Sequence, residues 1–192
     1  MEKYVNHPKC IAIGECGLDY FRLPEDEVEK AQNIKKQKEV FIAQIEFAKK
    51  VKKPLIVHIR DASNDSRQIL VDYNAKEVGG VLHCYNASEH LLPLAEHNFY
   101  FGIGGVLTFK NAKKLIEILP KIPKDKLLIE TDAPYLTPHP HRGERNEPYY
   151  TVFVASKMAE LLEISVEEIE NITTSNAKKL FKEFSSLCLD TI

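Results

Sequence analysis

Apolar residues in this chain fall into five short continuous runs, separated by longer polar or amphipathic stretches. Within a run the apolar and polar positions do not alternate, which is typical of strands buried on both faces. We therefore predict strands near residues 10–14, 54–59, 79–84, 98–105 and 126–131. Because helical patterns lie between consecutive runs, we expect an α/β fold with parallel strands joined by right-handed crossovers.

The longest helical pattern lies between the first two predicted strands. Within residues 26–51 a helical stripe predicts an amphipathic helix, which Pro54 terminates; its apolar residues are Val40, Phe41, Ile45, Ala48 and Val51. Shorter helices are predicted near residues 64–74, 88–97 and 111–119.

The pattern changes after Thr131. A Pro-rich loop, "DAPYLTPHPHRGERNEP", leads into an all-helical end of the chain. There Ser165 and Glu168 form a capping box that opens one helix, and "TTSNAKKLFKEF" is expected to start another. We predict a single domain over residues 1–184 and a tail over residues 185–192.

Composition narrows the class of protein. A chain of 192 residues that is 44% apolar can bury one core, and a formal charge of −2 gives no sign of a general polycation. Cys10, Cys16, Cys84 and Cys188 form no CxxC pair, which favours reduced thiols over a disulfide framework. No stretch approaches the ~20 apolar residues of a membrane span. We therefore expect a soluble, cytoplasmic protein with no membrane partner.

Four of the predicted strands end at a carboxylate or an imidazole. These residues are Glu15, His58, His83 and Asp132. The carboxyl ends of parallel strands lie at one edge of a sheet, so the four side chains are expected to converge where (β/α) barrels carry their active sites. Two imidazoles and two carboxylates without a thiolate form a ligand set that suits Mg²⁺, Mn²⁺ or Zn²⁺.

Several of these residues and their neighbours have alternative roles. Glu15 stands among residues expected to be buried, and Arg60 is an alternative partner for it in a structural ion pair. Glu130 shares a strand face with Asp132, where it either orients a ligand or faces solvent. Asp19 either hydrogen-bonds its own loop or holds a metal-ligating histidine from outside.

Five segments of the chain match, in order and spacing, the successive motifs of one known family. The segments read "AIGECGLDYF", "PLIVHIRDA", "GGVLHCYNAS", "YFGIGGVLTFKNA" and "LLIETDAPYLTPHPHRGERNEP". They resemble the motifs of the TatD family of metal-dependent deoxyribonucleases, within the amidohydrolase superfamily. The resemblance implies a TIM-type (β/α) barrel of eight units, two divalent metal ions at its mouth, and hydrolysis of phosphodiester bonds. It also implies DNA as the substrate, trimmed from its 3′ end.

The resemblance assigns a role to each of the four convergent residues. Glu15 resembles the carboxylate that bridges both metal ions, and His58 and His83 resemble ligands of the second ion. Asp132 resembles the ligand of the first ion that also handles the proton of the attacking water. Asp132 and Glu15 are therefore the expected catalytic residues.

The chain departs from the family pattern before Glu15. Family members begin with a strand that carries a His-x-His pair, and two further β/α units follow before the glutamate motif. Here "HPH" occurs only at His139 to His141, in the Pro-rich loop, and we do not take it as a substitute. We expect about five of the eight units, a truncated chain, and one incomplete metal site. Open sheet edges favour self-association.

Arginine side chains near the predicted mouth are candidates for binding substrate phosphate, because guanidinium groups contact phosphates bidentately. The candidates are Arg60, Arg142 and Arg145, together with Asn146. A solvated surface loop is the alternative for the segment "HPHRGERNEP", residues 139–148. Two other functions stay open: an amidohydrolase acting on a small molecule, and a non-catalytic remnant or fragment of a split protein.

Overall fold

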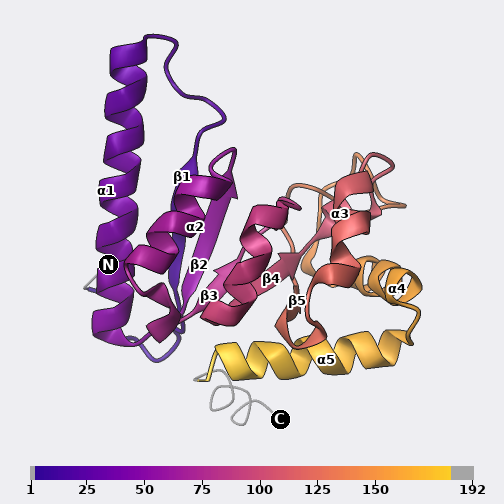
Figure 1. Ribbon diagram of the computed structural model, residues 1–192. Helices are drawn as coiled ribbons and strands as arrows, with labels where there is room; N and C mark the ends of the chain where they lie inside the picture. Colours follow the sequence, from indigo (N-terminus) through magenta and orange to yellow (C-terminus); the bar gives the residue numbers. More distant parts are fainter. Residues whose placement is uncertain (1–2, 183–192) are drawn as a thin grey trace.

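Within residues 3–182, which the computed structural model describes, five strands form one sheet in chain order (Figure 1). Their bounds are β1 Ile13–Asp19, β2 Leu55–Arg60, β3 Gly80–Leu82, β4 Phe99–Ile103 and β5 Leu127–Ile129. Each neighbouring pair is parallel. The predicted parallel α/β sheet is confirmed, and the predicted tail over residues 185–192 lies outside the described residues.

The first strand extends further than its apolar run predicts. Residues 16–19 pair with residues 57–60 of β2, and the register shifts between Ile13 and Cys16. Glu15 therefore lies inside β1 rather than after it. Pairing with β2 carries the strand through the polar positions that the hydrophobic pattern excludes.

Between residues 3 and 182 the chain also forms five α-helices: α1 Glu27–Val51, α2 Ser63–Asp72, α3 Lys113–Ile118, α4 Thr151–Leu162 and α5 Val166–Leu180. Short 3₁₀ segments are η1 Ala75–Glu77, η2 Glu89–His97, η3 Gly105–Thr108, η4 Leu119–Lys121, η5 Lys124–Lys126 and η6 Pro148–Tyr150. Figure 1 shows α1 standing beside β1, and α5 lying against β5 at the other end of the sheet.

Two of the helix predictions need correction. The segment predicted as a helix over residues 88–97 is the 3₁₀ segment η2, and it contains Pro93, which lacks an N–H donor and disfavours an α-helix. The helix predicted to start at Thr173 is the continuation of α5. There the Thr173 hydroxyl donates to the carbonyl of Ile169 at 2.9 Å, so this polar side chain is satisfied inside the helix.

Capping residues define the ends of α1. The Asp26 carboxylate accepts the N–H groups of Val28 and Glu29 at 3.0 and 2.9 Å. At the other end Lys52 adopts the left-handed conformation, with φ 56°, and closes the helix. The buried residues Phe41, Ile45 and Ala48 define the face of α1 that meets the core.

The core lies between the sheet and the helices that cover it. Phe41 and Ile45 of α1, with Phe99 and Phe101 of β4, are fully buried. All five residues of β4 are buried, which is why its sequence reads as a continuous apolar run. Of the strands that carry the site, β3 is likewise fully buried, whereas β1 and β2 are buried only in part.

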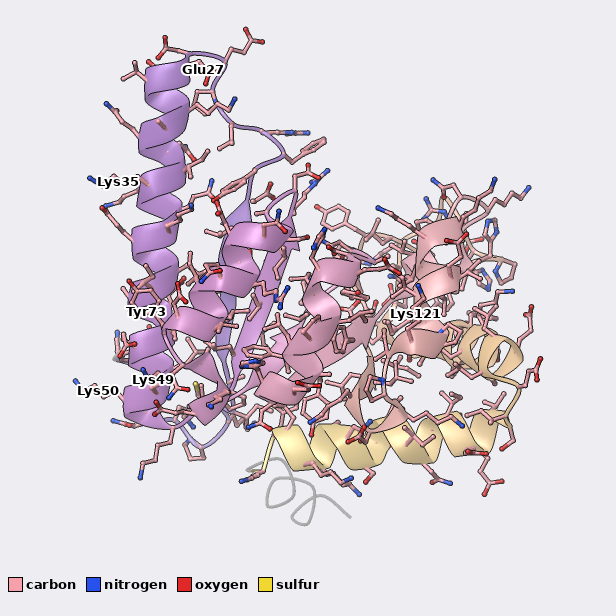
Figure 2. All side chains as sticks on the ribbon, in the orientation of Figure 1. Glu27, Lys35, Lys49, Lys50, Tyr73 and Lys121 are labelled. Atoms are coloured by element: carbon pink, nitrogen blue, oxygen red, sulfur yellow. The ribbon has the colours of Figure 1, made fainter. Side chains whose placement is uncertain are left out.

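The surface of α1 carries lysines that project into solvent, including Lys35 and Lys50 (Figure 2). The basic run over residues 49–53 does not form one cationic surface. Lys49 pairs with Glu46 at 2.9 Å, and Lys53 is buried. Over residues 3–182, no helix has the length and apolarity needed to cross a membrane.

Candidate metal centre

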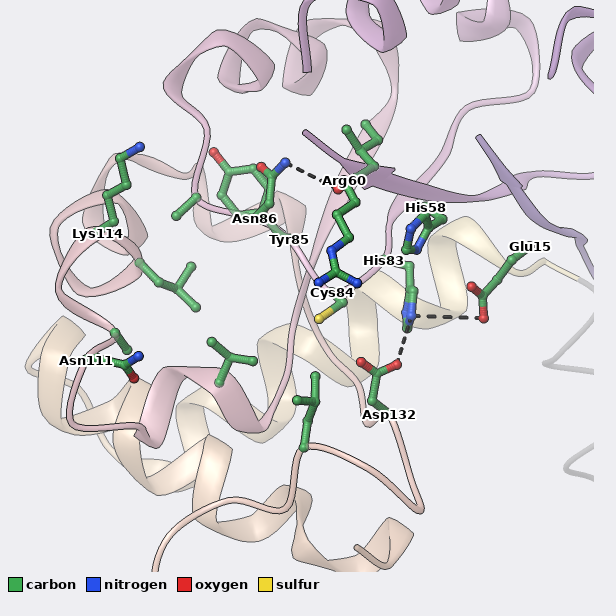
Figure 3. A pocket seen from close by; sticks show the side chains of 16 residues that line it. Glu15, His58, Arg60, His83, Cys84, Tyr85, Asn86, Asn111, Lys114 and Asp132 are labelled. Carbon is green, nitrogen blue, oxygen red and sulfur yellow. Dashed lines mark hydrogen bonds and ion pairs between the residues drawn. The ribbon is translucent and has the colours of Figure 1, made fainter. Parts of the chain in front are cut away.

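A cavity of about 560 Å³ brings together side chains from four strands or the segments that follow them (Figure 3). Glu15 comes from β1 and His58 from β2, while His83 directly follows β3 and Asp132 lies in the loop after β5. All four line the cavity, as does Arg60 at the end of β2. The convergence that parallel strands predict is therefore present in the structure.

His83 makes contacts with three carboxylates. Its Nε2 lies 3.0 Å from Oδ1 of Asp132 and 4.0 Å from Oε1 of Glu15, and its Nδ1 forms an ion pair with Oε2 of Glu130. Hydrogen bonds to Asp132 and Glu130 stabilise the imidazolium and raise the pKa of His83 to about 10. In turn, the hydrogen bond from His83 holds the pKa of Asp132 below its ordinary value, although burial opposes this.

Glu130 faces His83 rather than solvent. Its Oε2 atom also accepts the N–H of Cys84 at 3.4 Å, whereas Oε1 is buried and has no hydrogen-bond partner within the described part of the chain. A β-carbon at Gly104 would overlap Oε1 of Glu130. The missing side chain at position 104 therefore provides the space in which this carboxylate lies. Of the two roles that the sequence allows for Glu130, the structure has the one that orients His83.

A second carboxylate contacts the other histidine. Oδ2 of Asp19 lies 3.1 Å from Nε2 of His58, and Oδ1 accepts the N–H of Phe21 at 2.9 Å. Burial acts to raise the pKa of Asp19, but the hydrogen bonds from Phe21 and His58 outweigh it and leave the pKa below its ordinary value. Asp19 thus orders its own loop and contacts an imidazole, and the metal-ligating role of that imidazole stays a prediction.

Gln37 fixes Asp19 from α1, and sequence reasoning did not identify it. The Gln37 amide accepts the backbone N–H of Asp19 at 2.8 Å and donates to its carbonyl at 2.8 Å. Gln37 lies one helical turn before the buried Phe41, on the same side of α1. That spacing is the signal that the sequence offers, but it does not reveal which backbone groups the amide meets.

Glu15 is more accessible than the sequence suggests. Its side chain is 58% exposed, so the expectation of a buried carboxylate is wrong. The reason is that β1 stands at the edge of the sheet and pairs only with β2. Arg60, the alternative ion-pair partner, instead places its guanidinium 3.5 Å from the ring centroid of Phe21.

Arg142 and Arg145, two of the phosphate candidates, do not line the cavity. Arg142 donates to the carbonyl of Thr137 at 2.8 Å, and its guanidinium lies 3.8 Å from the ring centroid of Phe109. Arg145 pairs with Glu147 at 3.1 Å. Both guanidinium groups therefore stabilise the Pro-rich loop, and their role in phosphate binding stays a prediction.

Asn146 is buried in the same loop, where its amide donates to the hydroxyl of Thr131 at 3.1 Å and to the carbonyl of Tyr135 at 2.6 Å. It too lies outside the cavity wall, so its predicted contact with phosphate is untested. His141 stacks on Tyr150 with ring centroids 4.5 Å apart, also away from the cavity. Among the four phosphate candidates, Arg60 is the one that the structure places beside the convergent residues.

The donor atoms of the site fit a divalent cation by chemical type. Carboxylate oxygens and imidazole nitrogens are ligands of Mg²⁺, Mn²⁺ and Zn²⁺. Throughout residues 3–182, however, no group of three or more His, Cys, Asp or Glu side chains is spaced to surround one ion. The donors are instead paired with one another, His83 with Asp132 and His58 with Asp19. Their assignment as metal ligands stays a prediction.

The fold and the cavity together define an α/β protein whose polar site lies at one edge of a parallel sheet, as in (β/α) barrel enzymes. A family model described as TatD related DNase matches residues 1–182. The chain belongs to this TatD family.

Individual relatives show the same relationship. The chain is 50% identical over 179 residues to the Bacillus subtilis (strain 168) protein named uncharacterized metal-dependent hydrolase YabD, covering 92% of this chain and 67% of that protein. It is 41% identical over 172 residues to the Escherichia coli (strain K12) protein named uncharacterized metal-dependent hydrolase YcfH, covering 89% of this chain and 62% of the relative. This chain thus spans about two thirds of the length of these relatives.

A solved structure agrees with the fold. The crystal structure of YjjV, described as a TatD homolog from Escherichia coli K12, matches this chain with a TM-score of 0.82 at 26% sequence identity. The match covers 94% of this chain and 68% of YjjV. A TatD family hydrolase from Entamoeba histolytica matches with a TM-score of 0.72 at 25% identity, covering 94% of this chain and 65% of the other.

Proposed function

We propose that this chain forms the metal-binding side of a divalent-metal-dependent hydrolase that cleaves phosphodiester bonds and trims DNA from its 3′ end. The observation that carries the proposal is the single cavity lined by Glu15, His58, His83 and Asp132. The match to a family model described as TatD related DNase supports DNA as the substrate.

Glu15, His58, His83 and Asp132 are the residues that would hold the cation. When bound, a divalent cation supplies a Lewis acid that stabilises the charge developing on phosphate oxygens. Without added positive charge, the carboxylates at this end of the cavity repel an anionic substrate. Arg60 lines the cavity beside them and is the proposed contact for the phosphate.

Asp132 is the proposed acceptor of the proton that the attacking water releases. Its side chain lies 3.0 Å from Nε2 of His83, and the hydrogen bond orients the carboxylate. The hydrogen bond from His83 keeps Asp132 ionised by lowering its pKa, which also makes the carboxylate a weaker base. To hold a cation, His83 would have to be neutral, and that hydrogen bond would then be absent. Glu130, bonded to the opposite nitrogen of the same ring, fixes the imidazole.

The test uses the purified chain, stripped of metal with EDTA and supplied with Mg²⁺, Mn²⁺ or Zn²⁺. The proposed activity would release a 3′ label from a single-stranded oligonucleotide as mononucleotide and give a ladder of shortened products from a 5′-labelled one. Asp132→Asn and Glu15→Gln should abolish both signals. Asp125→Asn, an exposed residue outside the cavity, is the matched control and should keep them.

Other outcomes decide between the remaining functions. Cleavage of simple amides without shortening of DNA would identify a small-molecule hydrolase. Metal binding with neither reaction would indicate a non-catalytic chain and refute the proposal. Shortening of DNA that survives His58→Ala combined with His83→Ala would show that the ligand assignment is wrong.

A further inference from the structure

The cavity that contains the candidate metal centre has two chemically different ends. Figure 3 shows Glu15, His83 and Asp132 together at one end, with Asn111 and Lys114 at the other. Much of the remaining wall is apolar and consists of Ile59, Ala87, Val106, Ala112, Leu115 and Leu136. The reaction proposed above uses the charged end alone, so the apolar wall and its distant polar rim need a separate explanation.

Two side chains in the middle of the cavity have their polar groups already engaged. The hydroxyl of Tyr85 donates to the carbonyl of Ser88 at 2.8 Å, and its ring packs edge-on against Phe101 with centroids 4.9 Å apart. Asn86 donates to the carbonyl of Ile59 at 3.3 Å. These bonds fix a rigid wall, with an aromatic ring in it, that offers a ligand mainly apolar contact.

Asn111 and Lys114 differ from that wall because both side chains are exposed. Asn111 lies just before α3, and Lys114 lies in its first turn. An amide and an ammonium at one rim can hydrogen-bond the polar edge of a ligand whose flat body lies against the apolar residues. Positive charge therefore occurs at both ends of the cavity, at Arg60 and at Lys114.

We propose that the apolar part of the cavity is a subsite for the base and sugar of one terminal nucleotide, with Asn111 and Lys114 contacting the polar edge of the base. This inference rests on the proposed function, because the phosphate of that nucleotide is placed beside Arg60 and the candidate metal centre. Bases stack on aromatic and apolar surfaces whatever their identity, and their edges carry donors and acceptors. A ligand with an anionic group, an apolar body and a polar edge matches the order of these groups along the cavity.

The size of the cavity supports one nucleotide rather than a longer segment of strand. Cavities of ~300–1,000 Å³ enclose most of the surface of one small ligand, and this cavity measures about 560 Å³. A subsite of this size holds one nucleotide, as an enzyme that acts on the end of a strand requires. Asn111 and Lys114 thereby become specificity-determining residues for a hydrolase that acts on ends.

Binding of two small probes tests the subsite without reference to catalysis. Calorimetry with the purified chain, with and without Mn²⁺, compares deoxyadenosine 5′-monophosphate with 2-deoxyribose 5-phosphate, which lacks the base. We expect the nucleotide to bind ~10-fold more tightly, as one stacked and hydrogen-bonded base contributes. Lys114→Ala and Asn111→Ala should weaken nucleotide binding several-fold and leave binding of the sugar phosphate unchanged. Lys113→Ala, an exposed neighbour outside the cavity wall, is the matched control and should alter neither.

The proposed subsite would be overturned if the two probes bound with equal affinity or if neither bound. It would also be overturned if Lys113→Ala weakened nucleotide binding as much as Lys114→Ala does. The oligonucleotide assay on the same preparation separates this result from the proposed function. Shortening of DNA without base-dependent binding would refute the subsite alone. Base-dependent binding without shortening of DNA would uphold the subsite and refute the nuclease.

Discussion

Gly17 of β1 lies directly against the backbone carbonyl of His58 in β2, and a β-carbon at position 17 would overlap that oxygen. Gly17 also has φ +137°, a conformation that residues with side chains rarely adopt. The close approach of the two strands beside the cavity therefore depends on the absence of a side chain.

Gly17→Ala is expected to destabilise the fold and to displace His58. The strained backbone alone costs about 1–3 kcal/mol, and the overlap with His58 adds to it. Urea denaturation measures the decrease in the free energy of unfolding. Gly143→Ala is the matched control, because Gly143 also has positive φ, +93°, but a β-carbon at that position would meet nothing within 4 Å. If the free energy of unfolding fell equally in the two variants, the contact with His58 would make no contribution to stability.

Glu130→Gln tests whether the carboxylate behind His83 orients the imidazole for a cation. Loss of an outer partner of a metal-ligating histidine typically lowers metal affinity ~10–100-fold. We expect a reduction of that order in Mn²⁺ affinity, measured by calorimetry, while the far-ultraviolet circular dichroism is unchanged. Glu144→Gln removes a comparable contact from His141, outside the cavity, and should leave Mn²⁺ affinity intact. A Glu130→Gln variant with full affinity would argue against the orienting role.

Gln37→Ala removes two hydrogen bonds between α1 and the backbone of Asp19. At about 0.5–1.5 kcal/mol for each bond, the free energy of unfolding should fall by about 1–3 kcal/mol. Chemical denaturation provides the measurement, and Gln32→Ala, an exposed position on the same helix, is the control for helix propensity. If both variants lose the same stability, the amide contributes nothing through Asp19.

Asp65 should make stability depend on pH in the acid range. Its carboxylate lies 2.7 Å from Nζ of Lys38 and accepts the hydroxyl of Tyr20 at 2.8 Å. The bond from Lys38, aided by Tyr20 and opposed by burial, holds the pKa of Asp65 below the ordinary value of 3.8. A lowered pKa in the folded state gives stability that is present above the unfolded pKa and is lost as pH falls through the folded pKa.

Asp65→Asn should therefore reduce stability near neutral pH, and the difference from the parent protein should shrink as the pH falls below 3.8. Urea denaturation at a series of pH values measures this convergence. A difference that stays constant across the acid range would mean that the interaction does not depend on the charge of Asp65.

The sequence predicts the sheet well, because each strand contains a continuous apolar run. The predicted burial on both faces holds for β3 and β4 but not for β1 and β2, in which buried positions alternate with partly exposed ones. It predicts the convergence of His58, His83 and Asp132 for a related reason: parallel strands deliver their ends to one edge. It misplaces Glu15, since pairing between strands extends β1 beyond its apolar residues. The sequence also predicts an α-helix where the structure has the 3₁₀ segment η2, because the apolar pattern there is helical but Pro93 disfavours an α-helix.

For the side chains that position the candidate site residues, the sequence allows two roles each and does not decide between them. Whether Asp19 and Glu130 meet histidines depends on distances across the sheet, which no local pattern encodes. Gln37 gives no sequence signal beyond its helical face, and Lys114 reads as one of many surface lysines. Gln37 acts through Asp19, which lies 18 positions away in the chain.

The space beside Gly104 constrains how this protein can diverge. Because Oε1 of Glu130 occupies the volume that a β-carbon at position 104 would need, the two positions are coupled. A side chain added at position 104 would displace the Glu130 carboxylate from its place beside His83, and a shorter residue at position 130 would remove that carboxylate. Both single-step routes pass through an impaired intermediate, so the pair is expected to be inherited together.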